Sequence, residues 1–190
     1  DDAFQAASVG SLPSGWTAAK TGAGEGSVWK IQEDLTSPSG TKVLTQTASG
    51  PGPLFSLCVA DQPRTADVDL TIQLKALSGK IDQGGGPVWR YQDADNYYIA
   101  RVNPLENNFR VYRVVDGKRT QLGTADVQAT AGQWHTIRIE HRAHRIQCSL
   151  NGKLSLEVAD DTISKAGQIG FWTKADAVTS FVAPVLAVED

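Results

Sequence analysis

Between Asp67 and Leu77 the sequence alternates polar and apolar residues without a break. The apolar positions are Val68, Leu70, Ile72, Leu74 and Ala76. A two-residue period over this length puts every apolar side chain on one face of a β-strand, whereas a helix would distribute them around its surface. The stretch therefore predicts a strand with one dry face and one wet face, and a second layer must cover the dry face.

Several other short segments carry strand patterns separated by turn residues. Asp116-Gly117 and Asn151-Gly152 each lie between apolar runs, where such dipeptides favour two-residue hairpin turns because the turn needs positive φ. No convincing amphipathic helix occurs, so the sequence predicts an all-β, two-sheet antiparallel sandwich of about a dozen strands. Besides 67–77 and a hairpin at 84–102, we expect strands at 28–32, 42–47, 54–60, 109–115, 134–141, 146–150, 154–158, 167–173 and 180–188.

The length of 190 residues and the hydrophobic content of 41% suit a single domain over residues 1–190, with residues 1–15 as an N-terminal arm. The net charge of -3 argues against nucleic acid as a partner, because such proteins present a clustered basic face. No apolar run reaches the length of a membrane span. The chain begins at Asp1 and contains no methionine, so we expect either a processed end, as removal of an export signal leaves, or a cloning boundary.

Cys58 and Cys148 are the only cysteines, and each lies within an apolar strand pattern. We expect two buried thiols that act as small hydrophobic side chains, since a domain of this size does not need a covalent cross-link. A disulfide between them is the alternative if the chain is exported.

The hairpin at 84–102, with its polar turn at 93–96, is expected at the centre of a curved sheet and as the floor of a ligand groove. Alternation sends Arg90 and Arg101 to the exposed face of that sheet, where a charge costs little free energy. It assigns five hairpin residues to the core: Trp89, Tyr91, Tyr98, Ala100 and Val102.

Five stretches in this order resemble concanavalin A-like jelly rolls: GGPVWRYQDADNYYIARVN, VVDGKR, GQWHTIRIE, RIQCSLNGKLSLEV and GQIGFWTKAD. Over roughly residues 14–182, the sequence is similar to bacterial exported domains related to the LamG-like domains and to the 3-keto-disaccharide hydrolase family. The resemblance implies a two-sheet jelly roll whose concave face holds carbohydrate, in a protein of the periplasm or the exterior.

Six outward side chains are predicted to bind carbohydrate. An aromatic ring can lie against the C–H face of a sugar, and arginine supplies donors in a fixed plane for the hydroxyl groups. The predicted set is Arg90, Tyr97, Arg101, Arg138, Glu140 and Trp172. We therefore expect an exported, non-catalytic domain with a glycan groove on its concave sheet.

Two other functions stay open from the sequence. A glycoside hydrolase or 3-keto-disaccharide-type sugar-cleaving enzyme is implied by the resemblance alone; it requires two carboxyl groups flanking one bond, such as Glu140 with Glu106 or Asp176. No Glu-x-Asp-x-Glu pattern and no Gly-x-Ser-x-Gly elbow occurs, so no catalytic residue is assigned. The third possibility is a structural or adhesive module whose sheet face meets another protein.

Metal binding is the remaining chemistry. Asp93 and Asp95 lie in a loop with clustered oxygens, which favours Ca²⁺, but aspartate also suits a tight turn, and we expect the turn role. His135, His141 and His144 show no usual zinc-ligand spacing and are expected at solvated strand edges. No metal and no cofactor is therefore assigned.

Overall fold

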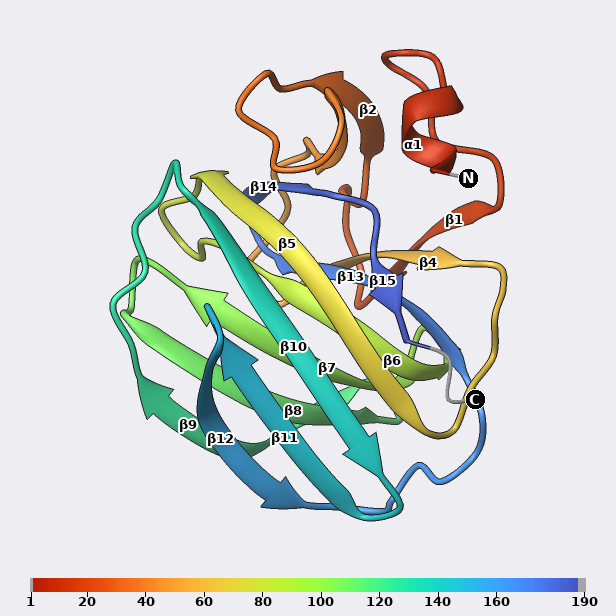
Figure 1. Ribbon diagram of the computed structural model, residues 1–190, viewed down its shortest axis with the longest axis vertical. Helices are drawn as coiled ribbons and strands as arrows, with labels where there is room; N and C mark the ends of the chain where they lie inside the picture. The colour runs from red at the N-terminus through yellow and green to blue at the C-terminus, as the bar shows by residue number, and fades with distance from the viewer. Residues whose placement is uncertain (1, 188–190) are drawn as a thin grey trace.

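Two antiparallel sheets face each other in the computed structural model, which describes residues 2–187 (Figure 1). Sheet A contains, in hydrogen-bonded order, β1 (Trp16–Thr21), β4 (Phe55–Ala60), β13 (Gln168–Lys174), β6 (Gly86–Asp93), β7 (Asn96–Asn103), β8 (Asn108–Val115) and β9 (Lys118–Asp126). Sheet B contains β12 (Lys153–Ala159), β11 (Arg145–Leu150), β10 (Trp134–Arg142), β5 (Val68–Ser78), β14 (Val178–Phe181), β3 (Lys42–Gln46) and β2 (Trp29–Glu33), and β15 (Val185–Leu186) pairs with β5. One helical turn, α1 (Ala3–Ala6), lies within the expected arm. The predicted antiparallel two-sheet sandwich is confirmed.

Strand positions follow the predicted pattern with three differences. β1 was not expected, β9 follows the predicted Asp116-Gly117 turn but no range was predicted for it, and the closing strand expected at 180–188 is divided into β14 and β15. Pro184 lies between these two short strands, and a proline has no backbone N–H to donate to a sheet. Val188 lies outside the described residues.

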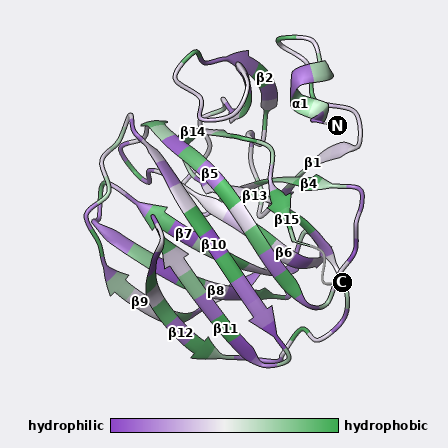
Figure 2. Cartoon of the chain, viewed as in Figure 1, coloured by the Kyte–Doolittle hydropathy of each residue, from purple (hydrophilic) through white to green (hydrophobic). Residues whose placement is uncertain are grey.

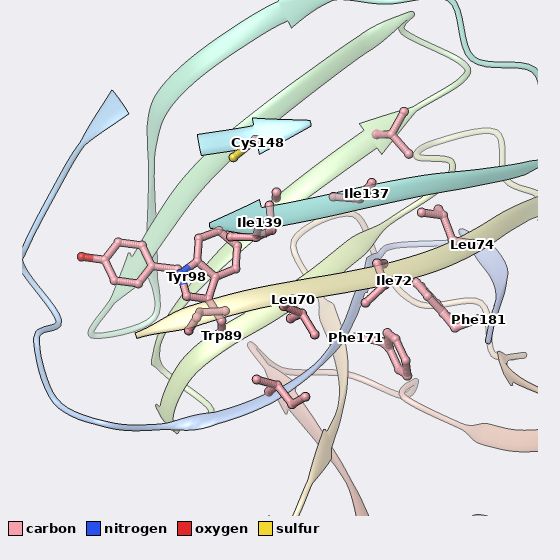
Figure 3. Close-up of a cluster of buried hydrophobic side chains, with 14 of the residues drawn as sticks. Leu70, Ile72, Leu74, Trp89, Tyr98, Ile137, Ile139, Cys148, Phe171 and Phe181 are labelled. Atoms are coloured by element: carbon pink, nitrogen blue, oxygen red, sulfur yellow. The ribbon is translucent and has the colours of Figure 1, made fainter. Parts of the chain in front are cut away.

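The main core fills the space between the sheets. β5 supplies Leu70, Ile72 and Leu74 from sheet B, and Figure 3 shows them beside Phe171 of sheet A. Figure 2 shows the alternation of hydrophilic and hydrophobic residues along β5 and β10, the two central strands of sheet B. This alternation leaves one face of sheet B apolar toward the core and the other polar toward solvent.

A bulge in β6 changes the facing predicted for the hairpin. Trp89 pairs with Tyr98, but the register shifts between Trp89 and Asp93, and Arg90 has a positive φ of 46°. The extra residue turns Tyr91 to the opposite face, so Trp89 lies in the main core and Tyr91 does not. The assignment of Tyr91 to the core was therefore wrong. The other four assigned residues do lie in the core: Trp89, Tyr98, Ala100 and Val102.

The outer face of sheet A, turned away from sheet B, carries a second apolar layer that we call the outer cluster. It consists of Phe55, Leu57, Val59, Val88, Tyr91, Tyr97, Ile99, Tyr112, Val114 and Trp172. None of these side chains is more than 8% exposed. The central strands of sheet A are thus buried on both faces, unlike those of sheet B.

Cys58 and Cys148 are free thiols in the main core, which confirms the expected thiol state. Burial raises the pKa of both, that of Cys148 to about 12. His135 and His141 are buried rather than solvated, so that expectation was wrong. Within residues 2–187, no helix has the length and apolar character needed to cross a membrane.

Candidate functional site

Arg119 on β9 lies over the rings of the outer cluster. Its guanidinium carbon is 4.3 Å from the ring centre of Tyr112, 5.2 Å from that of Phe55 and 5.8 Å from that of Trp172. These rings come from β8, β4 and β13. An arginine over aromatic faces is held by the negative charge density of the rings, which leaves its N–H groups free for other partners.

These contacts also show that the outer face of sheet A is concave. β9 and β4 are five strand positions apart in the sheet, which corresponds to about 24 Å along a flat sheet. Two side chains on a flat sheet cannot bridge that separation, yet Arg119 contacts Phe55. The sheet must bend so that its two ends approach each other over the outer face.

A network of charges centred on Arg101 lies on the same face. One terminal nitrogen of Arg101 is 3.3 Å from a carboxylate oxygen of Asp82; the other donates to Glu106 at 2.9 Å and to Asn108 at 2.8 Å. Lys174 is 3.2 Å from Asp82, and Arg110 is 3.5 Å from Glu106. The loop before β6, the turn after β7 and strand β8 therefore each supply a partner to the guanidinium of Arg101, and Lys174 and Arg110 join the network through its carboxylates.

Electrostatic effects join Arg119 to this network. Burial lowers the pKa of Arg119, and the nearby positive charges of Arg101 and Arg110 lower it further. The hydrogen bond from Asn108, together with Arg101, holds the pKa of Glu106 below its ordinary value. The face thus offers guanidinium donors and carboxylate acceptors together, beside a rigid aromatic layer.

The structure brings together three of the six predicted residues. Tyr97, Arg101 and Trp172 all lie on the outer face of sheet A, as expected. Their predicted exposure was wrong, because Tyr97 and Trp172 are 0% exposed and Arg101 is 2% exposed. The ring of Trp172 is covered by Phe55 and Arg119, and the hydroxyl of Tyr97 lies 2.6 Å from that of Thr21.

Arg90 lies elsewhere and has a structural role. Its guanidinium donates to the carbonyl oxygens of Ala66 at 2.6 Å, Ile163 at 2.9 Å and Ala143 at 3.2 Å. These three residues belong to three different loops at one end of the sandwich. The bulge in β6 turns Arg90 toward these loops, so its predicted place on an exposed sheet face was wrong.

Arg138 and Glu140 lie on β10, on the outer face of sheet B, and are therefore separated from Trp172 by the whole sandwich. Arg138 donates twice to Asp69 at 2.8 Å and once to Glu140 at 3.1 Å. The hydrogen bonds that Arg138 donates to Asp69 raise the pKa of Arg138. This arrangement is a cross-strand ladder of ion pairs, and it does not join the other predicted residues in one site.

The acidic residues proposed for catalysis are also separated or occupied. Glu140 is on sheet B, whereas Glu106 belongs to the network around Arg101. The carboxylate of Asp176 accepts the backbone N–H groups of Lys80, Ile81 and Asp82, so it stabilises that turn.

The turn containing Asp93 and Asp95 is held by its own hydrogen bonds. One carboxylate oxygen of Asp93 accepts the N–H of Asp95 at 2.8 Å and the side-chain amide of Asn96 at 2.9 Å. Across the described part of the chain, no group of three or more His, Cys, Asp or Glu side chains is placed to hold a metal ion. The geometry is that of an aspartate that stabilises a tight turn.

A hollow of about 540 Å³ lies elsewhere, where α1 and β1 meet the loops after β4 and β14. Phe4, Trp16, Pro63, Ile169 and Pro184 are among its lining residues. Its lining includes one charged side chain, Asp2. This hollow, whose lining also includes Ser14, Ser39 and Gln62, is thus a less charged alternative to the concave face of sheet A.

Sequence reasoning missed the residues that give the concave face its character: Arg119, Tyr112, Asp82, Lys174 and Phe55. The Asp116-Gly117 turn did place Arg119 near the start of a strand. No pattern in β9 shows that its side chain crosses the sheet to β4, because that contact depends on curvature. Lys174 lies two residues after Trp172 on β13, so the two side chains point to the same face of sheet A. This spacing was the signal that could have placed Lys174 on the concave face.

The model of the 3-keto-alpha-glucoside-1,2-lyase-like domain matches residues 9–181. The chain belongs to this family. No curated protein matches it in sequence. The match covers every strand of sheet A and all but β15 of sheet B, so the network around Arg101 and the outer cluster both lie within the lyase-like domain.

Solved structures share this fold at low sequence identity. The carbohydrate-binding module CBM66 from Bacillus subtilis has a TM-score of 0.72 and 16% identity over 92% of this chain and 96% of its own. The exoplasmic/lumenal domain of VIP36, in a form with Ca²⁺ and mannose bound, has a TM-score of 0.63 and 12% identity, covering 95% of this chain and 86% of its own. A Bacillus subtilis protein of unknown function with a galectin-like fold has a TM-score of 0.59 and 10% identity, covering 90% and 88%. The jelly-roll fold of the lyase-like domain is confirmed.

Proposed function

We propose that this domain binds carbohydrate on the concave outer face of sheet A and does not itself cleave it. The observation that carries the proposal is the position of Arg119, which joins three aromatic rings to the charged network of Arg101. Hydroxyl-rich ligands need donors and acceptors held in fixed positions, and this face supplies both. Two structures with this fold support a sugar as the ligand: CBM66 is a carbohydrate-binding module, and the VIP36 domain has mannose bound.

The partly exposed side chains of the concave face make the direct contacts with the sugar. The side chains of Glu106, Arg110 and Lys174 are 41%, 32% and 20% exposed. Trp172 and Tyr112 are buried and hold Arg119 in position from beneath. The role of the rings is thus to fix the polar groups, which lowers the entropy lost when a ligand binds.

Cleavage is the second candidate, because the chain belongs to a lyase-like family. Elimination from a 3-keto-glucoside requires a base that removes the proton on C2 while the bond from C1 to the leaving oxygen breaks. The carboxylates on the concave face are poorly suited to this task, since Asp82 and Glu106 are both held by cations. Hydrogen bonding and these cations lower the pKa of Glu106, which weakens it as a base.

The location of the site is tested by titrating the labelled protein with a panel of oligosaccharides in two-dimensional NMR. We expect shifts at the side-chain N–H groups of Arg119 and Trp172, and loss of binding in Tyr112→Ala. Trp134→Ala is the matched control, because Trp134 is a partly buried ring on sheet B beneath Lys75. Shifts confined to Trp16, which lines the hollow between α1, β1 and the loops after β4 and β14, would refute sugar binding on the concave face.

Catalysis is tested separately with a glucoside and its 3-keto derivative at equal concentrations. We expect no release of the leaving group above the buffer rate from either compound. Release from the 3-keto compound that disappears in Glu106→Gln would favour the lyase instead.

We also propose export to the periplasm or the exterior, supported by the resemblance of the sequence to exported domains and by the lumenal origin of VIP36. Fractionation of the native producing cells tests this, and recovery of the protein only from the cytoplasm would contradict it.

A further inference from the structure

Arg119 has no acidic partner in the described part of the chain and, unlike Arg90, whose guanidinium donates to three backbone carbonyls, it lacks an acceptor for one of its terminal nitrogens. No carboxylate oxygen among residues 2–187 lies within 4.0 Å of its guanidinium nitrogens. Carboxylate oxygens do lie within that distance of Arg101, Arg113 and Arg138. One terminal nitrogen of Arg119 is buried and has no hydrogen-bond acceptor. A buried donor without a partner destabilises the fold, so the structure retains Arg119 there at a cost in stability.

The positive charge of Arg119 is also not balanced by its surroundings. Arg101, Arg110 and Lys174 share two carboxylates, those of Asp82 and Glu106. The carboxylate of Asp176, on the adjoining turn, is taken up by backbone N–H groups. With Arg119 added, four cationic side chains lie beside the two carboxylates that pair with cations here, and Arg119 is the one of the four without an ion pair among residues 2–187.

A second arginine nitrogen on this face is unsatisfied. The Nε atom of Arg101 is buried without an acceptor, although both terminal nitrogens of Arg101 are bonded. Two guanidinium groups with unused donors therefore lie on one face; burial lowers the pKa of Arg119 most, and the positive charge of Arg101 adds to the lowering. A bound anion would both satisfy donors and remove the repulsion between these two charges.

We propose that the ligand is an acidic carbohydrate, a uronate-containing glycan, and that Arg119 selects it by binding the sugar carboxylate. The inference rests on the proposed carbohydrate binding and adds its chemical class. A guanidinium binds a carboxylate through two parallel hydrogen bonds, and these charge-assisted bonds are about twice as strong as neutral ones. The hydroxyl groups of the same sugar meet Glu106, Arg110 and Lys174, the partly exposed groups of the network.

The test compares pairs of oligosaccharides that differ in one group. Oligomers of galacturonate, glucuronate and mannuronate, each with its carboxyl-reduced neutral counterpart, are titrated into the full chain by calorimetry at 50 and 300 mM NaCl. We expect at least one uronate to bind tenfold or more tightly than its neutral counterpart, with the difference shrinking at the higher salt concentration. A sulfated oligosaccharide is included, and we expect it to bind more weakly than the uronate.

The variant Arg119→Gln removes the charge and keeps a polar side chain. We expect it to lose the preference for the uronate, so that the acidic and neutral oligomers bind with similar affinity. Arg145→Gln is the matched control, because Arg145 is an exposed arginine on sheet B paired with Glu157, and we expect it to retain the preference. If Arg119→Gln does not fold, Arg119→Lys keeps the charge and loses the planar double hydrogen bond, and we expect at least a fivefold loss of preference.

The outcomes separate the two proposals. Equal binding of acidic and neutral oligomers, tighter binding of the sulfated one, or a preference that survives in Arg119→Gln overturns the assignment of a uronate while leaving carbohydrate binding intact. Absence of binding to every oligosaccharide in the wild type overturns both.

Discussion

Lowering the pH from 7 to 5 should destabilise this protein through one buried histidine, His141. Its ring is 0% exposed between the sheets, and its Nδ1 accepts a hydrogen bond of 2.9 Å from the indole nitrogen of Trp89. Burial, with a contribution from Arg90, lowers the pKa of His141 from 6.5 to about 4. The native histidine therefore stays neutral at a pH where the unfolded histidine is protonated.

The sign and size of this change in the free energy of unfolding follow from proton linkage. Because the native pKa lies below the unfolded one, the unfolded state binds the proton first, and the free energy of unfolding falls as pH drops from 6.5 toward 4. The full loss is about 3.4 kcal/mol, and about 2 kcal/mol of it is reached by pH 5. Carboxylates with lowered pKa values, such as Glu106 and Asp160, lose their contributions mainly below pH 5, outside this window.

The assay is urea unfolding followed by tryptophan fluorescence at pH 7, 6.5, 6, 5.5 and 5. His141→Gln supplies an acceptor for Trp89 but does not titrate, so its free energy of unfolding should be nearly constant over this range. His144→Gln, at an exposed position, should follow the wild type. The reasoning fails if the wild type loses less than about 0.5 kcal/mol by pH 5, or if His141→Gln loses as much as the wild type.

Three further outcomes follow from the packing. Arg90→Met should lower the free energy of unfolding by about 3 kcal/mol or more in urea titrations, because three loop carbonyls lose their donor; a loss below about 1 kcal/mol would contradict its structural role. Gly167→Ala should cost about 1 to 3 kcal/mol, since its Cβ would lie 2.3 Å from the backbone of Arg90, whereas Gly52→Ala meets nothing within 4 Å and should be neutral by the same measurement. Cys58 and Cys148 should react with a thiol reagent only in denaturant, because burial raises both pKa values; rapid reaction of the native protein would argue against their burial.

The sequence predicted sheet B more accurately than sheet A, and the reason lies in how many faces each strand buries. β5 and β10 alternate polar and apolar residues, so their facing could be read directly. β7 reads Asn-Tyr-Tyr-Ile-Ala-Arg-Val-Asn and has no continuous polar face. Such a near-continuous apolar run is typical of a strand covered on both sides. That signal was present in β7 and would have predicted the burial of Tyr97.

Two other features could not be read from the pattern. The bulge at Arg90 adds one residue to β6, and alternation alone does not show where a strand gains a residue. The approach of Arg119 to Phe55 depends on the curvature of sheet A, which arises from all seven strands together. The direction in which a strand side chain points depends on the local sequence, whereas its burial depends on how the whole sheet bends.

The contrast between Arg119 and Arg138 supports the proposal that an anionic ligand binds to sheet A rather than to sheet B. Both arginines lie on outer faces, but Asp69 already binds Arg138 and raises its pKa, whereas burial and neighbouring cations lower the pKa of Arg119. An incoming anion at Arg138 would have to displace a carboxylate that makes two hydrogen bonds of 2.8 Å. At Arg119 the same anion would displace no acidic partner within residues 2–187 and would relieve existing repulsion. The free energy of binding an anionic ligand therefore favours the concave face of sheet A, even though the rings there are buried and the arginine of sheet B is the more exposed of the two.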